Sequence, residues 1–162
     1  MSNDLIITLP SYNEIPNVGL FLEQVTKYIG EYLAPVESFS LTSSMISNYV
    51  KKSIIKNPLK KQYDREQIAD LIIIAICKTV MTLDDVQLFI GLQNQDADID
   101  VTYENFRASF LAAMKQAFED QGSKKAAPAD TEAADSSILN YITVTVAHKV
   151  YLDNYFKNIR EQ

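Results

Sequence analysis

The sequence predicts a mainly α-helical protein that combines a winged helix-turn-helix, including a short two-stranded wing, with further helices at its C-terminal end. Most segments repeat their apolar residues every three to four positions, which is the spacing of one helix face. Only 4 of the 162 residues are glycine and 5 are proline, so little of the chain suits a loop-rich fold. Residues 54–63 interrupt the helical pattern with an apolar pair, a proline turn and a basic run, which favours two small paired strands.

The composition is that of a globular protein with one substantial core. Hydrophobic residues make up 47% of the chain and charged residues 22%, and 162 residues are enough to bury one core. We expect a winged helix-turn-helix domain with an N-terminal helix over residues 1–92 and a C-terminal helical region over residues 93–162. Residues 122–137 are rich in Ala, Asp and Ser, which predicts a flexible linker within the second region.

Neither an export signal nor a membrane span is predicted. The longest apolar run lies between Asp70 and Lys78 and is far shorter than the roughly 20 residues that a bilayer requires. Residues 1–10 lack the basic and apolar stretches of a signal peptide. The sequence therefore predicts a cytoplasmic protein without membrane contact.

The first two helices are predicted from apolar spacing and from capping residues. Pro16 suits a first helical turn, and apolar residues then recur at helical spacing as far as Leu33. Thr42 is a suitable N-cap for a second helix over residues 43–52, because its hydroxyl can accept an amide proton of the first turn. In that second helix the apolar residues share one side, which leaves a small polar and basic face exposed on the other.

Further helices are predicted along the rest of the chain. Asp64 and the glutamine three residues later form a capping box; the apolar run after them also fits a buried strand, but its length favours a helix. Thr82 begins a short helix that Gly91 is expected to end. Thr102 is expected to cap a long helix, and residues 138–159 return to a strongly apolar helical pattern.

Positive charge is concentrated in one short stretch of an acidic chain. The chain has 15 Lys and Arg against 21 Asp and Glu, a formal net charge of -6. Six of the 15 lie between Lys51 and Arg65 and are opposed only by Asp64, which leaves a local charge of +5. Such cations displace condensed counterions from DNA phosphates, and short polar side chains can approach base edges. Charge alone is equally compatible with a solvated lysine face.

The candidate DNA-contacting residues are the polar and basic residues of the second helix and of the basic stretch that follows it. They are Ser43, Ser44, Ser47, Asn48, Lys51, Lys52, Lys56, Lys60, Lys61 and Arg65. In this interpretation the second helix enters a DNA groove while the lysines hold phosphates, since base contacts specify and phosphate contacts position.

The order of residues in this part of the chain resembles two known families. Residues 46–58 read ISNYVKKSIIKNP and are similar to the recognition helix and first wing strand of MerR-type regulators, whose pattern is Ile-Arg-Tyr-Tyr-Glu-Lys-x-Gly-Leu-Leu-x-x-Pro. That likeness covers about residues 41–90. The Leu-Pro pair at residues 9–10 and the stretches at residues 45–52 and 60–63 more closely resemble domain-of-unknown-function family 1836, a Firmicutes group.

The resemblance to MerR proteins implies a DNA-binding transcriptional regulator that forms a homodimer, with residues 102–121 or 138–159 as the dimerisation helix. Ser47 stands where that family has an arginine that contacts DNA, and Ser53 stands where it has a glycine. If Ser53 keeps the left-handed turn, it costs on the order of 1 kcal/mol. The alternative function is a protein-interaction module, in which the same winged fold binds a partner protein through its basic stretch or through the acidic residues 84–104.

Catalytic and metal-binding patterns are not apparent in the sequence. His148 is the only histidine and lies in an apolar helical pattern, and Cys77 is a single cysteine within an apolar run. Asp96, Asp98 and Asp100 alternate like the start of a calcium loop, but the glycine and the closing glutamate of such a loop are missing. We therefore expect no enzyme activity and no cofactor, and no residue pattern identifies a small-molecule effector.

Overall fold

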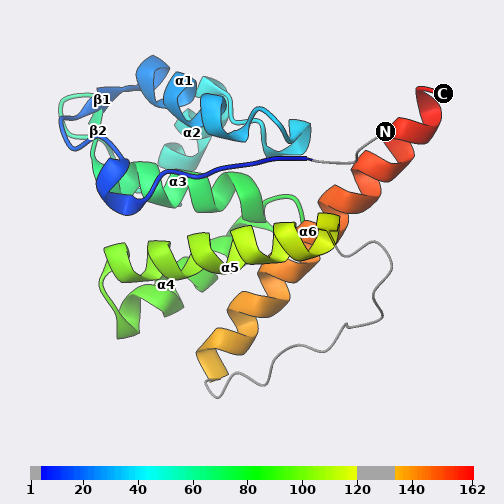
Figure 1. Cartoon of the computed structure of the whole chain (residues 1–162). Coiled ribbons are helices and arrows are strands. Elements are labelled where there is room, and N and C mark those ends of the chain that lie inside the picture. Colours follow the sequence, from blue (N-terminus) through cyan, green and yellow to red (C-terminus); the bar gives the residue numbers. More distant parts are fainter. Residues whose placement is uncertain (1–4, 120–133) are drawn as a thin grey trace.

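The computed structural model describes residues 5–119 and 134–162, with side chains described from residue 138 onward in the second range. These residues are mainly helical and include one small antiparallel sheet (Figure 1). The elements are, in chain order, η1 (Tyr12–Glu14), β1 (Leu20–Phe21), α1 (Leu22–Leu33), η2 (Glu37–Phe39), α2 (Ser43–Lys51), β2 (Gln62–Tyr63), α3 (Arg65–Cys77), α4 (Leu83–Asp96), α5 (Ile99–Glu119) and α6 (Ala134–Arg160). None of the helices in the described ranges has the length and apolar character needed to span a bilayer.

Helix α3 forms the centre of the molecule and packs against α1, α4, α5 and α6. Every residue from Gln67 to Cys77 is buried except Asp70, which is half-buried. A helix that is apolar on all sides needs neighbours on all sides, and α3 has them. The predicted capping box is confirmed, because Asp64 Oδ1 accepts from the Gln67 amide at 2.8 Å and Gln67 Oε1 accepts from the Asp64 amide at 2.8 Å. The apolar run is therefore a helix and not a buried strand.

Helix α1 begins six residues later than Pro16, where the sequence predicts its start. Gly19 interrupts the helical pattern with a φ of 74°, a left-handed conformation that glycine adopts without a Cβ clash. The next two residues form β1 instead, with Leu20 opposite Tyr63 of β2. A Cβ at Gly19 would lie 2.8 Å from Oε1 at the end of the Gln62 side chain, so a larger residue would also have to displace that side chain.

The predicted wing, in which residues 54–55 pair with residues 60–63, has a different pairing in the structure. Strand β2 pairs with β1, which comes from before α1, and the only bridge across the loop joins Leu59 to Gln62. Ile54 is unavailable for strand pairing because its amide donates to the Tyr49 carbonyl at 2.9 Å. The Ser53 amide donates to the Val50 carbonyl at 3.0 Å, so these residues form a Schellman cap on α2.

The boundaries of α4 and α5 also differ from the predictions. Thr82 caps α4 as expected, since its Oγ1 accepts from the Asp85 amide at 3.1 Å, but the helix continues past Gly91 to Asp96. Gly91 does not have the positive φ with which glycine ends a helix. Thr102 lies inside the first turn of α5, where its hydroxyl donates to the Asn94 side chain at 2.8 Å and so ties α5 to α4.

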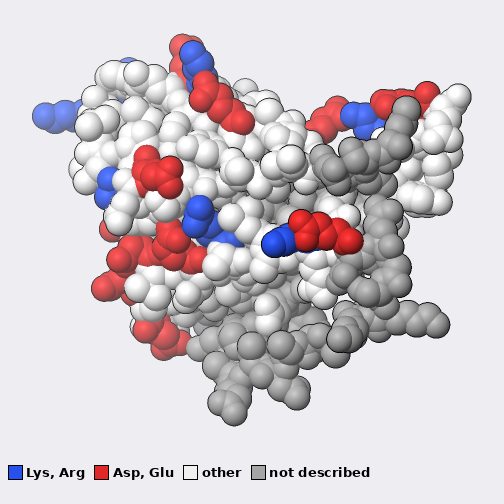
Figure 2. Space-filling view, viewed as in Figure 1, with Lys and Arg blue, Asp and Glu red and all other residues white. Residues whose placement is uncertain are grey.

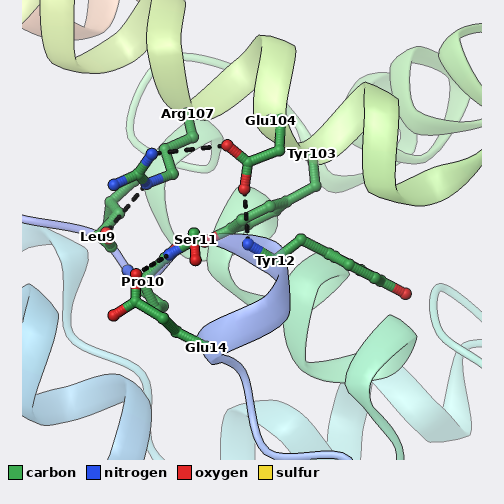
Figure 3. A network of polar contacts seen from close by, with 8 residues as sticks. All are labelled: Leu9, Pro10, Ser11, Tyr12, Glu14, Tyr103, Glu104 and Arg107. Atoms are coloured by element: carbon green, nitrogen blue, oxygen red, sulfur yellow. Dashed lines mark hydrogen bonds and ion pairs between the residues drawn. The ribbon is translucent and has the colours of Figure 1, made fainter.

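The N-terminal segment is held against α5 by a network of polar contacts (Figure 3). The Tyr103 hydroxyl donates to the Pro10 carbonyl at 2.7 Å, and Arg107 Nε donates to the Leu9 carbonyl at 3.0 Å. The Tyr12 amide donates to Glu104 Oε1 at 2.6 Å. Residues from before and after position 92 therefore pack together, and the division of the chain into two regions at that position stays a prediction.

Helix α6 closes the structure by packing its buried side on α5 and α3. The hydroxyls of Ser109 and Thr143 are 2.8 Å apart, and the rings of Phe118 and Tyr151 meet edge to face with centroids 5.5 Å apart. Of the linker predicted over residues 122–137, residues 122–133 lie outside the described residues, and residues 134–137 belong to α6.

Candidate nucleic-acid interface

Residues 43–63, which we call the basic segment, comprise α2, the loop after it and β2. The segment contains five lysines and no Asp or Glu, a charge of +5. The remaining residues of the chain contain ten Lys and Arg against 21 Asp and Glu, a charge of -11. The positive charge is thus local and stands against a strongly acidic background.

Helix α2 has the two faces that its sequence predicts. Thr42 Oγ1 accepts from the Met45 amide at 3.1 Å and begins the helix, as expected. Ile46 and Tyr49 are 0% and 3% exposed, so they anchor α2 in the core. The opposite face is solvent-exposed and carries Ser44, Ser47, Asn48 and Lys51, with Lys52 following at the end of the helix.

Ser43, the first residue of α2, is not part of this exposed face. Its hydroxyl lies 3.1 Å from Thr26 Oγ1, and its side chain is half-buried. The Thr26 hydroxyl also reaches the Leu22 carbonyl at 2.8 Å, so the pair joins the start of α2 to α1. Ser43 therefore positions α2, and its hydroxyl is already engaged within the chain.

The end of α2 has a left-handed turn at Ser53, the position at which the MerR pattern has glycine. Ser53 has a φ of 57°, a conformation that costs a residue with a Cβ about 1 kcal/mol. Its carbonyl accepts a hydrogen bond from Gln87 Nε2 of α4 at 2.9 Å. The turn that follows the exposed helix face is thus held from α4, a contact that the sequence analysis did not predict.

A second glutamine holds the middle of the basic segment. Gln67 is 6% exposed, and its Nε2 donates to the Lys56 carbonyl at 3.0 Å while its Oε1 completes the α3 cap. The sequence indicated only the capping role. Because both ends of the Gln67 amide are used, the loop that carries Lys56 is fixed to the buried helix α3 while the Lys56 side chain stays exposed.

The loop ends in a tight turn made of two lysines. Lys60 and Lys61 have φ values of 51° and 62°, and the Gln62 amide donates to the Leu59 carbonyl at 2.9 Å. Positive φ at both central residues is the mark of a type I′ turn, for which Asn-Gly is the preferred sequence. Two lysines in this conformation store about 2 kcal/mol of backbone strain, and such strain is concentrated at functional sites.

None of the five lysines of the basic segment forms an ion pair among the described residues. The ion pairs found in those residues lie in α5 and α6 and join Arg107 to Glu104 and Lys149 to Asp153. Exposed acidic residues gather elsewhere, at both ends of α4 and at the start of α5; they include Asp84, Asp85, Asp96, Asp98 and Asp100. Figure 2 shows acidic side chains gathered over the α4 and α5 end, and a basic side chain projecting at the end where β1 and β2 lie.

Arg65, the tenth candidate residue, has a different environment. Its Nε donates to the Ile15 carbonyl at 2.8 Å, its Nη2 donates to the Asn13 carbonyl at 3.3 Å, and its guanidinium lies 5.5 Å from the centroid of the Tyr12 ring. These contacts hold the N-terminal turn η1 on the start of α3. Arg65 therefore connects η1 to α3, whereas the five lysines have exposed side chains.

A half-buried carboxylate that the sequence analysis did not single out lies between α3, α4 and α5. Asp70 of α3 borders a cavity of about 10 Å³, together with Gln93 of α4 and Phe106 of α5. Its Oδ1 has no hydrogen-bond partner. Burial, followed by the negative charge of Glu66, raises the pKa of Asp70 to about 7. The signal in the sequence is a single acidic residue inside the otherwise apolar run from 68 to 77.

The cysteine thiol and the possible metal ligands of the sequence analysis have no environment that favours catalysis or metal binding in the described residues. Cys77 is fully buried, and burial raises the pKa of its thiol to about 12, so a thiolate nucleophile is disfavoured. Among the residues that the structure describes, no three His, Cys, Asp or Glu side chains are grouped so as to hold a metal ion.

One protein-family model matches most of this chain. The family model for a domain of unknown function (DUF1836) matches residues 10–120, more than half of the chain. The chain belongs to the DUF1836 family. The match extends from η1 to the end of α5, so it includes the whole basic segment and Asp70, and it leaves α6 outside. No curated protein and no solved structure matches the chain significantly.

Proposed function

We propose that this DUF1836 chain is a sequence-specific, DNA-binding transcriptional regulator of MerR-like winged helix-turn-helix type. In this proposal α1 and α2 form the helix-turn-helix, α2 enters a DNA groove, and the lysine turn at residues 59–62 is the wing. The observation that carries the proposal is the exposed polar and basic face of α2, which continues into a strained turn of two unpaired lysines.

The residues take two roles. Ser44, Ser47 and Asn48 are short and exposed, so they suit contact with base edges. The lysines, which extend from the C-terminal end of α2 and from the loop, suit contact with phosphates on either side of the groove. A serine hydroxyl at position 47 makes a weaker DNA contact than an arginine, so affinity depends more heavily on the five lysines.

Rigid support favours this role over that of a solvated lysine face. Tyr49 anchors α2 in the core with its buried side chain. Gln87 holds the backbone at Ser53, and Gln67 holds the backbone at Lys56. A lysine face that only contacts solvent needs no such support of its backbone. Contacts with DNA phosphates are strengthened when the backbone holds the lysines at fixed positions relative to one another. The left-handed backbone at both lysines of the turn is a further cost that solvation alone does not explain.

The charge distribution predicts how binding responds to salt. Five phosphate contacts for each chain correspond to a slope of about -4.5 in a plot of log affinity against log salt concentration. The charge of -11 on the rest of the chain repels DNA and so restricts binding to one face. Such a regulator acts in the cytoplasm, where the chromosome of a bacterium is accessible.

The test is selection of bound fragments from genomic DNA by the wild-type chain. A Lys51→Ala/Lys52→Ala variant removes two cations from the proposed interface, and a Lys115→Ala/Lys157→Ala variant removes two exposed cations from α5 and α6 as a matched control. We expect the wild type and the control to enrich the same fragments, and the interface variant to lose the enrichment.

If the wild type and the interface variant recover the same random background, the DNA proposal is wrong. The protein-interaction module is then the better interpretation, since its partner does not have to be a polyanion. Titration of salt against a recovered fragment gives a second measurement, because phosphate contact requires a steep loss of affinity.

A further inference from the structure

Large apolar side chains are exposed at the end of the molecule where β1 and β2 lie. Val18, Phe21 and Leu59 are 79%, 51% and 82% exposed. Leu59 has the largest exposed fraction of the large hydrophobic side chains in the described residues, and it comes directly before Lys60 and Lys61. Figure 1 shows this end on the opposite side of the molecule from α6. Contact between lysines and phosphates does not explain why apolar side chains are exposed here.

The strand pairing places Phe21 and Leu59 on the same face. Gln62 pairs with Phe21 on one side and forms a bridge with Leu59 on the other. Residues directly opposite each other in antiparallel strands have their side chains on one face of the sheet. The neighbouring pair, Leu20 and Tyr63, occupies the other face, where Tyr63 is 4% exposed and belongs to the core. The outward face therefore carries Phe21, Gln62 and Leu59 in a row, which we call the tip row.

The backbone of Leu59 is fixed before any partner binds. Its carbonyl accepts from the Gln62 amide at 2.9 Å, which closes the turn of the two lysines. The Lys56 backbone, three residues earlier, is tied to α3 through Gln67. Less conformational entropy is lost on binding when the backbone is already ordered. Leu59 is therefore an exposed apolar side chain on a rigid support.

We propose that Leu59 is an apolar wedge, which enters the DNA minor groove next to the groove that α2 occupies and unstacks one base step. This inference rests on the proposed function, because the lysines must hold the DNA first. Proteins that bind the minor groove combine Lys and Gln side chains with inserted apolar wedges such as Leu and Phe. The tip row and the two lysines of the turn have this composition. Base faces supply the apolar contact that the phosphate backbone does not.

The tip row fits a DNA groove better than a lipid surface. Binding to a bilayer interface strengthens with the apolar area that is buried there, and the polar Gln62 interrupts the apolar row. The chain outside the basic segment carries a charge of -11, which an anionic bilayer repels across its whole plane. A groove admits only the turn, so the acidic part of the chain stays farther from the phosphates.

The wedge predicts a sequence preference that hydrogen bonds to the bases do not provide. Pyrimidine–purine steps such as TA are unstacked easily, and narrow A·T-rich minor grooves have a negative potential that attracts lysine. We therefore expect a TA step in the DNA at the position of the turn. Replacement of this step by AA keeps the A·T content and makes the step stiffer. The replacement is expected to weaken wild-type binding by about 10-fold.

The test uses the DNA fragment that the wild-type chain enriches from genomic DNA, with 2-aminopurine in place of single adenines. Stacking quenches the fluorescence of this base, so unstacking raises it. We expect the wild type to raise the fluorescence at one TA step. Leu59→Ala is expected to lose this rise and the preference for TA over AA, while it keeps the salt dependence of binding because all five lysines remain. Leu59→Met keeps an apolar side chain and is expected to keep the rise.

The matched control is Leu88→Ala, which shortens an exposed leucine of α4 in the same way. Leu88 is 65% exposed and lies on the helix that carries acidic residues at both ends. We expect this control to bind and to unstack the DNA as the wild type does. Both leucines are exposed, so both alanine variants are expected to keep the wild-type melting temperature.

The outcomes separate the wedge from the proposed function. Steep salt-dependent binding without a fluorescence rise, or a rise that persists in Leu59→Ala, would overturn the wedge and leave the proposed function in place. If the wild type enriches no fragment, both proposals fail. Vesicles of equal parts phosphatidylcholine and phosphatidylglycerol provide the last comparison, and we expect no sedimentation of the chain with them. Sedimentation that depends on Leu59, without a fluorescence rise on DNA, would assign the tip row to a lipid surface and overturn the wedge.

Discussion

Asp70 offers a prediction in which the structure determines both the sign and the size of the effect. Its folded-state pKa is raised from 3.8 to about 7, with burial as the largest cause. Well below pH 4 the carboxyl is protonated in both the folded and the unfolded chain, so its contribution to folding is fully present. As pH rises from 4 to 7 the unfolded chain releases this proton first, and stability is lost throughout that interval.

The magnitude follows from the pKa difference. A gap of about three pKa units at about 1.4 kcal/mol each sets an upper value near 4 kcal/mol for the stability lost above pH 7. About 1.5 kcal/mol of this is already lost at pH 5, which leaves about 2.5 kcal/mol between pH 5 and pH 8. Asp70→Asn keeps the shape of the side chain and removes the ionisation, so it is expected to abolish this pH-dependent loss.

The assay is urea unfolding of the wild type and of Asp70→Asn at pH 5 and pH 8, with Asp96→Asn as a control for an exposed carboxylate. We expect the stability difference between Asp70→Asn and the wild type to be about 2.5 kcal/mol larger at pH 8 than at pH 5, and the control to show no such change. An Asp70→Asn effect that is the same at both pH values would refute the assignment of a neutral, buried carboxyl.

Three further predictions concern the basic segment and its supports. Lys60→Asn/Lys61→Gly relieves the left-handed strain, so we expect a gain of about 1 to 2 kcal/mol in urea unfolding together with a salt slope reduced by about 2 in DNA binding. Gly19→Ala adds a Cβ only 2.8 Å from an atom of β2 at a positive φ, so we expect a loss of about 2 kcal/mol in the same unfolding assay. Gln67→Ala removes the tie to Lys56 and half of the α3 cap, and a loss of about 2 kcal/mol together with weaker DNA binding is expected from paired unfolding and binding measurements.

Several elements of the fold could be predicted because their signals lie within one or two helical turns. The caps at Thr42, Asp64 and Thr82 are confirmed, since each depends on a side chain and an amide three residues apart. The two faces of α2 follow from the alternation of apolar and polar residues along the helix. The left-handed turn at Ser53 is present, but the sequence suggested it only through the MerR resemblance, which has glycine at that position.

The errors concern contacts between residues far apart in the chain. The start of α1 was placed too early because the pairing of Leu20 with Tyr63, 43 positions away, has no local signature. The wing strands were paired with each other because Ile54 is apolar, whereas its amide caps α2. Ser43 and Arg65 stay predictions as DNA-contacting residues; what the sequence did not show is that the Ser43 hydroxyl lies beside that of Thr26 and that Arg65 donates to the Ile15 carbonyl.

The sequence by itself determined where α2, α3 and α4 begin and which face of α2 is apolar. It also showed that positive charge is concentrated in one segment of an acidic chain. These properties depend only on residue type and local spacing. Only the tertiary structure decided the partner of β2, the environment of Asp70, and which side of α6 is buried. Each of these depends on contacts with residues far away in the sequence. The apolar spacing of a helix shows that a face is apolar, but it does not show which residues cover that face.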